Sequence, residues 1–185
     1  MTDILTRNTL NGIDLDALGE MIETVRGNPA CGAAAFRVKT EWKGQTRSES
    51  TVESFTCAGD PIPRSFTIVA DEPCELLGTD TAPNPQELLL SALNACMMVG
   101  YVAQAAVRGV KLEECRIETE GELDLAGFLG LDEDIPPGYR RINYTVHIRG
   151  NGTPEQYQEI HQAVMASSPN YFNLAQPVQM CGRLA

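Results

Sequence analysis

The stretch LLLSALNACMMVGYVAQAAV, residues 88–107, decides the fold of this chain because it runs for twenty residues without a charged side chain. Only a lipid bilayer or a protein core holds so apolar a segment as a helix. The segment is rich in alanine and carries Ser91, Asn94 and Gln104, a composition that disfavours insertion into a membrane. We therefore predict a central core helix with Cys96 near its middle.

The residues before this stretch carry the signals that open a helix. Asn84 suits the N-cap, Pro85 suits the first helical position, and Glu87 stands where a capping box places an acid. Gly109 is able to close the helix. A helix that is apolar on nearly all sides needs cover on nearly all sides. One domain offers only one or two sheet faces, so we predict that a second copy of the chain supplies the rest, giving a homodimer.

Alternating apolar and polar residues on both sides of the central helix predict antiparallel strands with one solvated face. The expected strands are 36–42, 47–55, 65–70, 114–125, 141–148 and 177–180. Two further helices are expected at 14–26 and, after the cap Thr153, at 154–167. We expect Phe36, Val38 and Trp42 in the core, and Pro61 and Pro63 as breaks before the third strand. The pattern predicts an α+β fold with antiparallel sheets wrapped around the central helix, made of residues 31–185, and a helical appendage made of residues 1–30.

Composition excludes several classes of function. The chain has 185 residues and a formal net charge of -11, and an acidic surface repels nucleic acid and anionic lipid headgroups. The first residues lack the basic-then-apolar pattern of a secretory signal, so we expect a cytoplasmic protein. The six cysteines form no C-x-x-C pair, and neither His147 nor His161 lies near a cysteine at metal-ligand spacing. We expect no metal and no cofactor, and no partner that would make either histidine a base.

Cys96 has two interpretations on the residues alone. A cysteine between Ala95 and Met97 is typical of a small core residue, because free cysteine is among the most buried residue types. A reactive cysteine needs a nearby cation or a helix N-terminus to stabilise its thiolate, and Cys96 lies about three turns into its helix. A cation must then come from elsewhere. Arg47 is the best candidate by position, and the alternatives are Arg37, Arg64, Arg140 and Arg141.

The stretch from Gly78-Thr-Asp through Asn84-Pro-Gln-Glu-Leu to Ala95-Cys96 resembles the OsmC/Ohr family of hydroperoxide-reducing proteins. Arg108-Gly109-Val110, the acidic strand after it, and Ser168-Pro169 fit the same layout. The resemblance extends from about Ala34 to the C-terminus and implies an intertwined homodimer. It also implies that Cys96 is the peroxidatic cysteine, which attacks a hydroperoxide to give a sulfenic acid, and that Arg47 lies beside its thiolate.

Two positions depart from the family pattern. The second, resolving cysteine of the family falls on Ser168, which cannot form a disulfide, and the family's glutamate falls on Gln86, one residue before Glu87. A neutral amide does not hold an arginine as a carboxylate does. Resolution by an external small-molecule or dihydrolipoyl thiol is therefore expected, with Cys115 and Cys181 as other possible resolving thiols.

Two hypotheses of function follow. In the first, the chain is a cytoplasmic thiol peroxidase that reduces small hydrophobic hydroperoxides through Cys96 and Arg47, with a thiol as reductant. In the second, it is a non-enzymatic dimer of the same fold that binds a small hydrophobic ligand in an interface cleft lined by Cys96.

Overall fold

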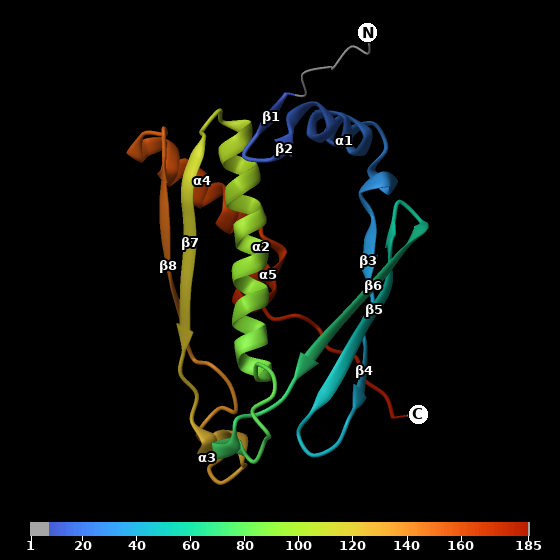
Figure 1. Cartoon of the computed structure of the whole chain (residues 1–185), viewed down its shortest axis with the longest axis vertical. Helices are drawn as coiled ribbons and strands as arrows, with labels where there is room; N and C mark the ends of the chain where they lie inside the picture. The colour runs from blue at the N-terminus through green and yellow to red at the C-terminus, as the bar shows by residue number, and fades with distance from the viewer. Residues whose placement is uncertain (1–7, 185) are drawn as a thin grey trace. The chain divides into compact units, whose positions relative to one another are not determined.

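The structure is a computed structural model and describes residues 8–184. The chain divides into two compact units, one made mainly of Asp14–Leu89 and the other of Leu10–Ile13 with the residues from Leu90 onward. Each unit combines helix with antiparallel strands (Figure 1). The α+β class predicted from the sequence is confirmed, whereas the boundary at residue 30 stays a prediction.

The first unit contains helix α1 and a four-stranded antiparallel sheet. Its elements are α1 (Leu15–Gly27), the 3-10 helix η1 (Pro29–Gly32), β3 (Ala34–Phe36), β4 (Lys39–Trp42), β5 (Ser48–Cys57), β6 (Asp60–Ala70) and the 3-10 helix η2 (Cys74–Leu76). Strand β5 pairs with β3 and β4 along one edge and with β6 along the other. A two-residue hairpin, β1 (Thr9–Leu10) and β2 (Ile13–Asp14), precedes α1, whose N-cap Asp14 accepts a hydrogen bond from the Ala17 N–H.

Two predicted strands of this sheet were wrong in their bounds. The strand expected at 36–42 is split into β3 and β4, because β5 carries an irregularity between Val52 and Ser54 that shifts the pairing register. Strand β6 starts at Asp60 and includes Pro61 and Pro63, which were expected to break the chain. An edge strand tolerates proline because its missing N–H need not enter a ladder.

One face of this sheet is apolar and uncovered within the chain. Residues paired across antiparallel strands share a face, and the register pairs Phe36 with Phe55 and Val52 with Phe66. The rings of Phe36 and Phe55 stack at 5.8 Å, and the Arg64 guanidinium lies over the Phe66 ring. The most exposed members of this face are Phe36 (75%), Trp42 (75%) and Phe66 (55%).

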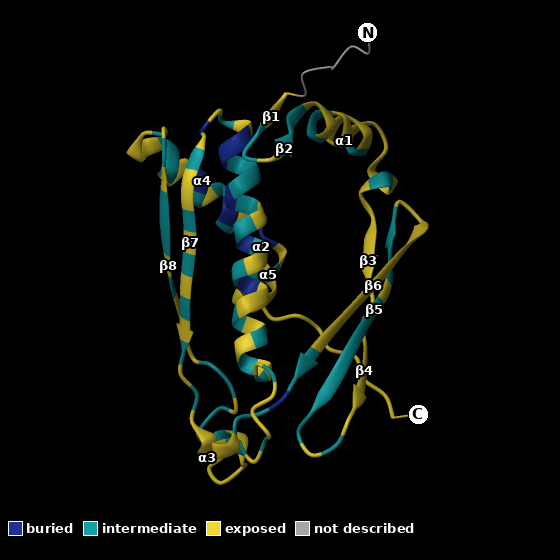
Figure 2. Cartoon of the chain, viewed as in Figure 1, coloured by how far each residue is buried: buried dark blue, intermediate teal, exposed yellow. Residues whose placement is uncertain are grey.

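The first unit lacks an apolar core of its own. Among the described residues, every buried hydrophobic side chain belongs to the second unit, and the only fully buried group of the first is Asp71. The expectation that Phe36, Val38 and Trp42 lie in the core is therefore wrong for the single chain. Helix α1 likewise buries no residue. A sheet of this size needs its apolar face covered to be stable, and Figure 2 colours most of β3, β4 and β6 as exposed.

The second unit is built on the central helix. Its elements are α2 (Pro85–Val107, whose first turn groups with the first unit), β7 (Leu112–Gly121), α3 (Leu125–Phe128), β8 (Ile142–Gly150), α4 (Pro154–Ser167) and α5 (Pro169–Ala175). Strands β7 and β8 form an antiparallel pair whose inward residues, including Cys115, Ile117, Tyr144 and Val146, pack against α2 and α4. The prediction of an antiparallel sheet on a central helix is confirmed here, as Figure 1 shows.

The core of this unit lies between α2 and α4. Met97 and Tyr101 of α2 and Ile160 and Val164 of α4 are almost completely buried. Gly100 permits the close approach of the two helices, because a Cβ there would lie 3.2 Å from both methyl groups of Val164. Thr153 caps α4 in a full capping box with Gln156, as its sequence predicts.

The predicted end of the chain was wrong. The strand expected at 177–180 is absent, and residues 177–184 have no regular structure. Instead Ser168 ends α4 and caps the short helix α5, with Pro169 at its first position. Strand β7 also ends earlier than predicted, at Gly121, against which the ring of Tyr139 packs.

Helix α2 is long and apolar enough to cross a membrane by length and composition alone, and it is the single such helix among residues 8–184. Core helices of soluble proteins pass the same test, and 22% of its most apolar window is buried inside the chain. Its exposed positions include Val99 and Val107.

Candidate active site

The Cys96 sulfur lies where helix α2 meets the start of helix α5. The Ser168 hydroxyl donates to Cys96 Sγ at 3.4 Å, and the Asn170 backbone N–H donates to the same sulfur at 3.5 Å. Ser168 is 4% exposed, whereas Cys96 is partly accessible. Two hydrogen-bond donors from the turn before α5 are thus directed at this one sulfur.

The turn between α4 and α5 holds these donors in place. The Ser168 N–H donates to Val164 O at the end of α4, and the Ser168 hydroxyl oxygen accepts from the Tyr171 N–H at 3.4 Å. The Asn170 side chain donates to Ala92 O of α2 at 2.8 Å. These hydrogen bonds connect the turn of α2 that carries Ala92 and Cys96 to the start of α5.

Arg47 lies in the first unit, next to a buried carboxylate. Its Nη1 donates to Thr81 Oγ1 and its Nη2 contacts Glu49 Oε1, both at 3.1 Å. Thr81 in turn donates its hydroxyl to Asp71 Oδ2 at 2.9 Å, and the hydroxyl of Thr46 donates to Asp71 Oδ1 at 2.7 Å. Arg47 thus belongs to a network centred on Asp71.

Asp71 accepts six hydrogen bonds from the described residues. Besides Thr46 and Thr81, the hydroxyl and N–H of Thr79 and the N–H of Glu72 donate to it. The hydroxyl of Thr79, then that of Thr46, hold the pKa of Asp71 well below its usual range, although burial opposes them. The charged carboxylate therefore organises the loop before α2.

The two predicted site residues are described in separate units. Cys96 belongs to the unit built on α2 and α4, and Arg47 to the unit built on the four-stranded sheet. Their pairing stays a prediction. Among the alternative arginines, Arg37 contacts Thr56, Arg64 lies over aromatic rings and Arg140 donates to Asp134 O.

The start of α2 distinguishes the roles of Gln86 and Glu87. The Asn84 N–H donates to Glu87 Oε2 and the Glu87 N–H donates to Asn84 Oδ1, both at 2.8 Å. This reciprocal pair confirms Glu87 as a capping residue. Gln86 makes no side-chain hydrogen bond within residues 8–184, so its amide does not hold Arg47 there.

Both histidines have hydrogen-bond partners. The Tyr101 hydroxyl and His161 Nδ1 lie 2.5 Å apart in the core, and His147 Nε2 lies 3.2 Å from Glu118 Oε2 on the solvated face. Burial raises the pKa of Tyr101, so Tyr101 stays a neutral phenol. Tyr144 lies next to His161 and meets the Tyr171 ring edge-on at 6.3 Å.

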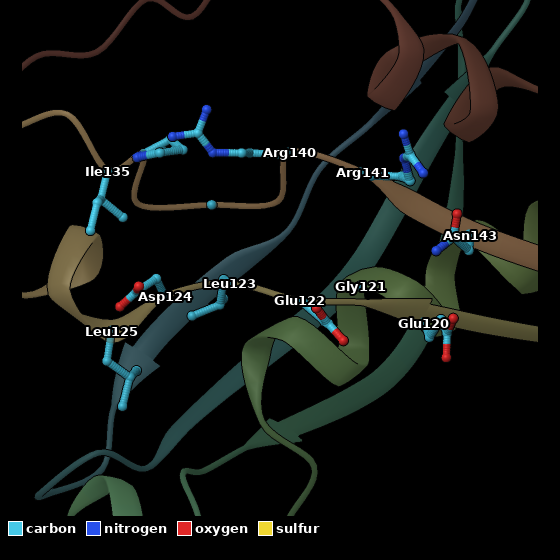
Figure 3. Close-up of a pocket in the computed structure, with 12 residues that line it drawn as sticks. Glu120, Gly121, Glu122, Leu123, Asp124, Leu125, Ile135, Arg140, Arg141 and Asn143 are labelled. Atoms are coloured by element: carbon cyan, nitrogen blue, oxygen red, sulfur yellow. The ribbon is translucent and has the colours of Figure 1, made fainter.

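A separate pocket of about 760 Å³ lies where β7 ends and β8 begins. Figure 3 shows Arg140 and Arg141 from one segment and Glu120, Glu122 and Asp124 from the other. Neither Cys96 nor Ser168 lines this pocket. The apolar residues Phe128, Leu129 and Leu131, which follow β7, also do not line it and are exposed. No group of three or more potential metal ligands occurs among the described residues.

The comparison with protein families decides the affiliation of the chain. A model of the OsmC-like proteins matches residues 78–180. The chain belongs to this family. The match includes Cys96 and Ser168 but leaves Arg47 outside. No curated protein matches the chain by sequence.

Solved structures of OsmC-like proteins share the fold at low identity. One from Mycoplasma pneumoniae is 18% identical with a TM-score of 0.59 over 77% of this chain and 88% of that chain. One from Vibrio cholerae is 14% identical with a TM-score of 0.52, over 74% of this chain and 90% of the other. An OsmC-like hydroperoxide resistance protein from Jannaschia is 18% identical, with a TM-score of 0.46 over 82% and 93% of the two chains.

Sequence reasoning missed three residues of these networks. Asn170 follows Ser168-Pro169, a sequence typical of a helix N-cap and first helical position, and that signal could have predicted α5. Asp71 and Thr81 lie in a stretch rich in turn residues, which gives no sign that one carboxylate gathers three threonine hydroxyls.

We predict that the Ser168→Cys variant forms a disulfide with Cys96. The Ser168 oxygen is 3.4 Å from the Cys96 sulfur, and small side-chain rotations bring two sulfurs at such positions to a bond of about 2.05 Å. Oxidation with diamide, followed by peptide mass spectrometry, should find the 96–168 crosslink. Ser167→Cys is the control. The Ser167 hydroxyl donates to Ala163 O rather than to Cys96, so this variant should give no crosslink. Equal crosslinking in both variants would contradict the geometry.

We also predict that Asp71→Asn destabilises the protein in a pH-dependent manner. The pKa of Asp71 is lower in the folded than in the unfolded chain, so its stabilisation is fully present above the unfolded value of about 3.9 and is lost as the pH falls further. The difference in melting temperature between wild type and variant should be large at pH 7 and shrink below about pH 4. The exposed Asp80→Asn in the same loop is the control. A difference in melting temperature that does not change with pH would contradict a lowered pKa of Asp71 in the folded chain.

Proposed function

We propose that the chain is a thiol peroxidase of the OsmC-like family that reduces organic hydroperoxides through Cys96. The observation that carries this proposal is the pair of hydrogen-bond donors, Ser168 Oγ–H and Asn170 N–H, directed at Cys96 Sγ. A cysteine that merely fills a core requires no such donors. The hydroperoxide resistance proteins among its relatives support the same role at the level of the family.

The proposed reaction begins with attack of the Cys96 thiolate on the outer oxygen of the hydroperoxide. An S–O bond forms as the O–O bond breaks, and Cys96 becomes a sulfenic acid that keeps the hydroperoxide's O–H. The alkoxide that leaves takes a proton from water and departs as the alcohol. Ser168 and Asn170 donate to the sulfur before the reaction and keep it facing the start of α5. Arg47 is proposed to stabilise the negative charge that develops on the departing oxygen.

An external thiol completes the proposed cycle, because Ser168 occupies the place where a resolving cysteine would act. The thiol attacks the sulfenic sulfur and releases water, giving a mixed disulfide. A second external thiol then attacks the external sulfur of this mixed disulfide. A disulfide of the two external thiols leaves, and the Cys96 thiolate is restored. None of the other cysteines within residues 8–184 contacts Cys96 Sγ. We further propose that the cycle takes place in the cytoplasm, where small thiols are reduced.

The proposed assembly is a homodimer. The first unit has an exposed apolar sheet face with Phe36, Trp42 and Phe66 and buries no hydrophobic side chain of its own. A second copy offers an equally apolar partner surface, and twofold symmetry would cover both sheets at once. The uncharged side of α2 supports the same arrangement, since Val99 is 69% exposed.

Turnover tests the proposed activity. Cumene hydroperoxide should be converted to the alcohol in the presence of dithiothreitol, and Cys96→Ser should lose the activity almost completely because the attacking sulfur is gone. Cys115→Ser, a change at a partly buried cysteine of the same unit, is the control. If wild type and Cys96→Ser consume hydroperoxide equally slowly, the proposal fails. The non-enzymatic alternative, binding of a small hydrophobic ligand beside Cys96, would then be favoured.

Light scattering tests the proposed dimer. The chain has a mass of 20.1 kDa, and we expect a particle of twice this mass at micromolar concentration. Phe66→Asp on the apolar sheet face should weaken association, because a buried unpaired charge is costly. Thr67 lies on the opposite face of the same strand, so the control Thr67→Asp should leave the mass of the particle unchanged. A monodisperse particle of one chain mass for wild type would contradict the dimer.

A further inference from the structure

The guanidinium of Arg47 is held from two sides in the first unit. On one side Nη2 contacts Glu49 Oε1 at 3.1 Å, two residues along the chain, and both side chains are about one-third exposed (34% each). On the other side Nη1 donates to Thr81 Oγ1 at 3.1 Å. A planar guanidinium held by two of its nitrogens has a defined orientation, because its donors are fixed relative to each other.

Thr81 is itself fixed by the buried carboxylate of Asp71. Its N–H and its hydroxyl both donate to Asp71 Oδ2, at 3.2 and 2.9 Å. Because the hydroxyl proton of Thr81 is directed at Asp71, its oxygen presents a lone pair to Arg47. The order of donors therefore runs from Arg47 through Thr81 to Asp71.

The same carboxylate fixes the backbone of the arginine. Thr46, the residue before Arg47, donates its hydroxyl to Asp71 Oδ1 at 2.7 Å. Asp71 is 1% exposed, so these bonds are shielded from competing water. Thus one buried group anchors both the main chain beside Arg47 and the acceptor of its guanidinium.

We infer that Glu49 and the Thr81–Asp71 pair are positioning residues that orient Arg47 for the proposed reaction at Cys96. This inference rests on the proposed function. Glu49 supplies the charge-assisted contact and Thr81 the neutral one, which leaves the third nitrogen of the guanidinium, Nε, and the remaining N–H groups available to a substrate oxygen. Lys43 Nζ lies 4.0 Å from Glu49 Oε2, the carboxylate oxygen that does not contact Arg47.

A double-mutant cycle tests the inference. The second-order rate constant for oxidation of Cys96 by cumene hydroperoxide is measured in wild type, Arg47→Ala, Glu49→Gln and the double variant. Loss of one charge-assisted contact should slow Glu49→Gln about tenfold. If Glu49 acts only through Arg47, the double variant should be no slower than Arg47→Ala. Glu53→Gln on the same strand is the control and should react like wild type.

Rotation of the guanidinium provides a readout that is independent of activity. In protein labelled with nitrogen-15 arginine, NMR should detect hindered rotation of the Arg47 guanidinium in wild type and faster rotation in Glu49→Gln and Thr81→Val. Glu49→Asp should restore part of the restriction. Unchanged rotation in both variants, or rate losses that add in the double variant, would overturn the inference. If the guanidinium is held but Arg47→Ala oxidises as fast as wild type, then the proposed role of Arg47 fails while its anchoring stands.

Discussion

The contact between Gly100 of α2 and Val164 of α4 determines where the chemistry of this protein lies. It lets the two helices approach closely, as a Cβ at position 100 would meet both methyl groups of Val164. Because Ser168 follows directly on the last turn of α4, that approach brings its hydroxyl to the Cys96 sulfur, and α5 then adds the Asn170 N–H. The site on α2 is therefore a product of core packing rather than of a flexible loop.

The first unit depends on a different constraint, namely the buried charge of Asp71. A sheet whose apolar face is exposed contributes little stability alone, yet its arginine has a defined setting because three threonine hydroxyls and Arg47 are organised around one carboxylate. In the account proposed above, a second copy covers the apolar face, and the carboxylate fixes the arginine before any partner or substrate binds.

Sequence predicts well what adjacent residues determine. Asn84, Pro85 and Glu87 predict the start of α2, and the capping box is present. The split between β3 and β4 follows from a register shift in β5, which the sequence of residues 36–42 does not carry. Asn170 and Cys96 are separated by 74 residues, so their contact depends on the packing of α2 on α4. The alternation at Phe36 and Trp42 indicates an apolar face, but not that the chain itself leaves it uncovered.

The most direct test of the central claim is competition among the six cysteines for a limiting amount of hydroperoxide. Sulfenic acid is trapped with dimedone and assigned to individual residues by mass spectrometry. We expect Cys96 to be labelled first, although Cys74 and Cys181 are more exposed, because Ser168 and Asn170 prepare only the Cys96 sulfur. Labelling that follows exposure, with Cys74 and Cys181 ahead of Cys96, would contradict the account.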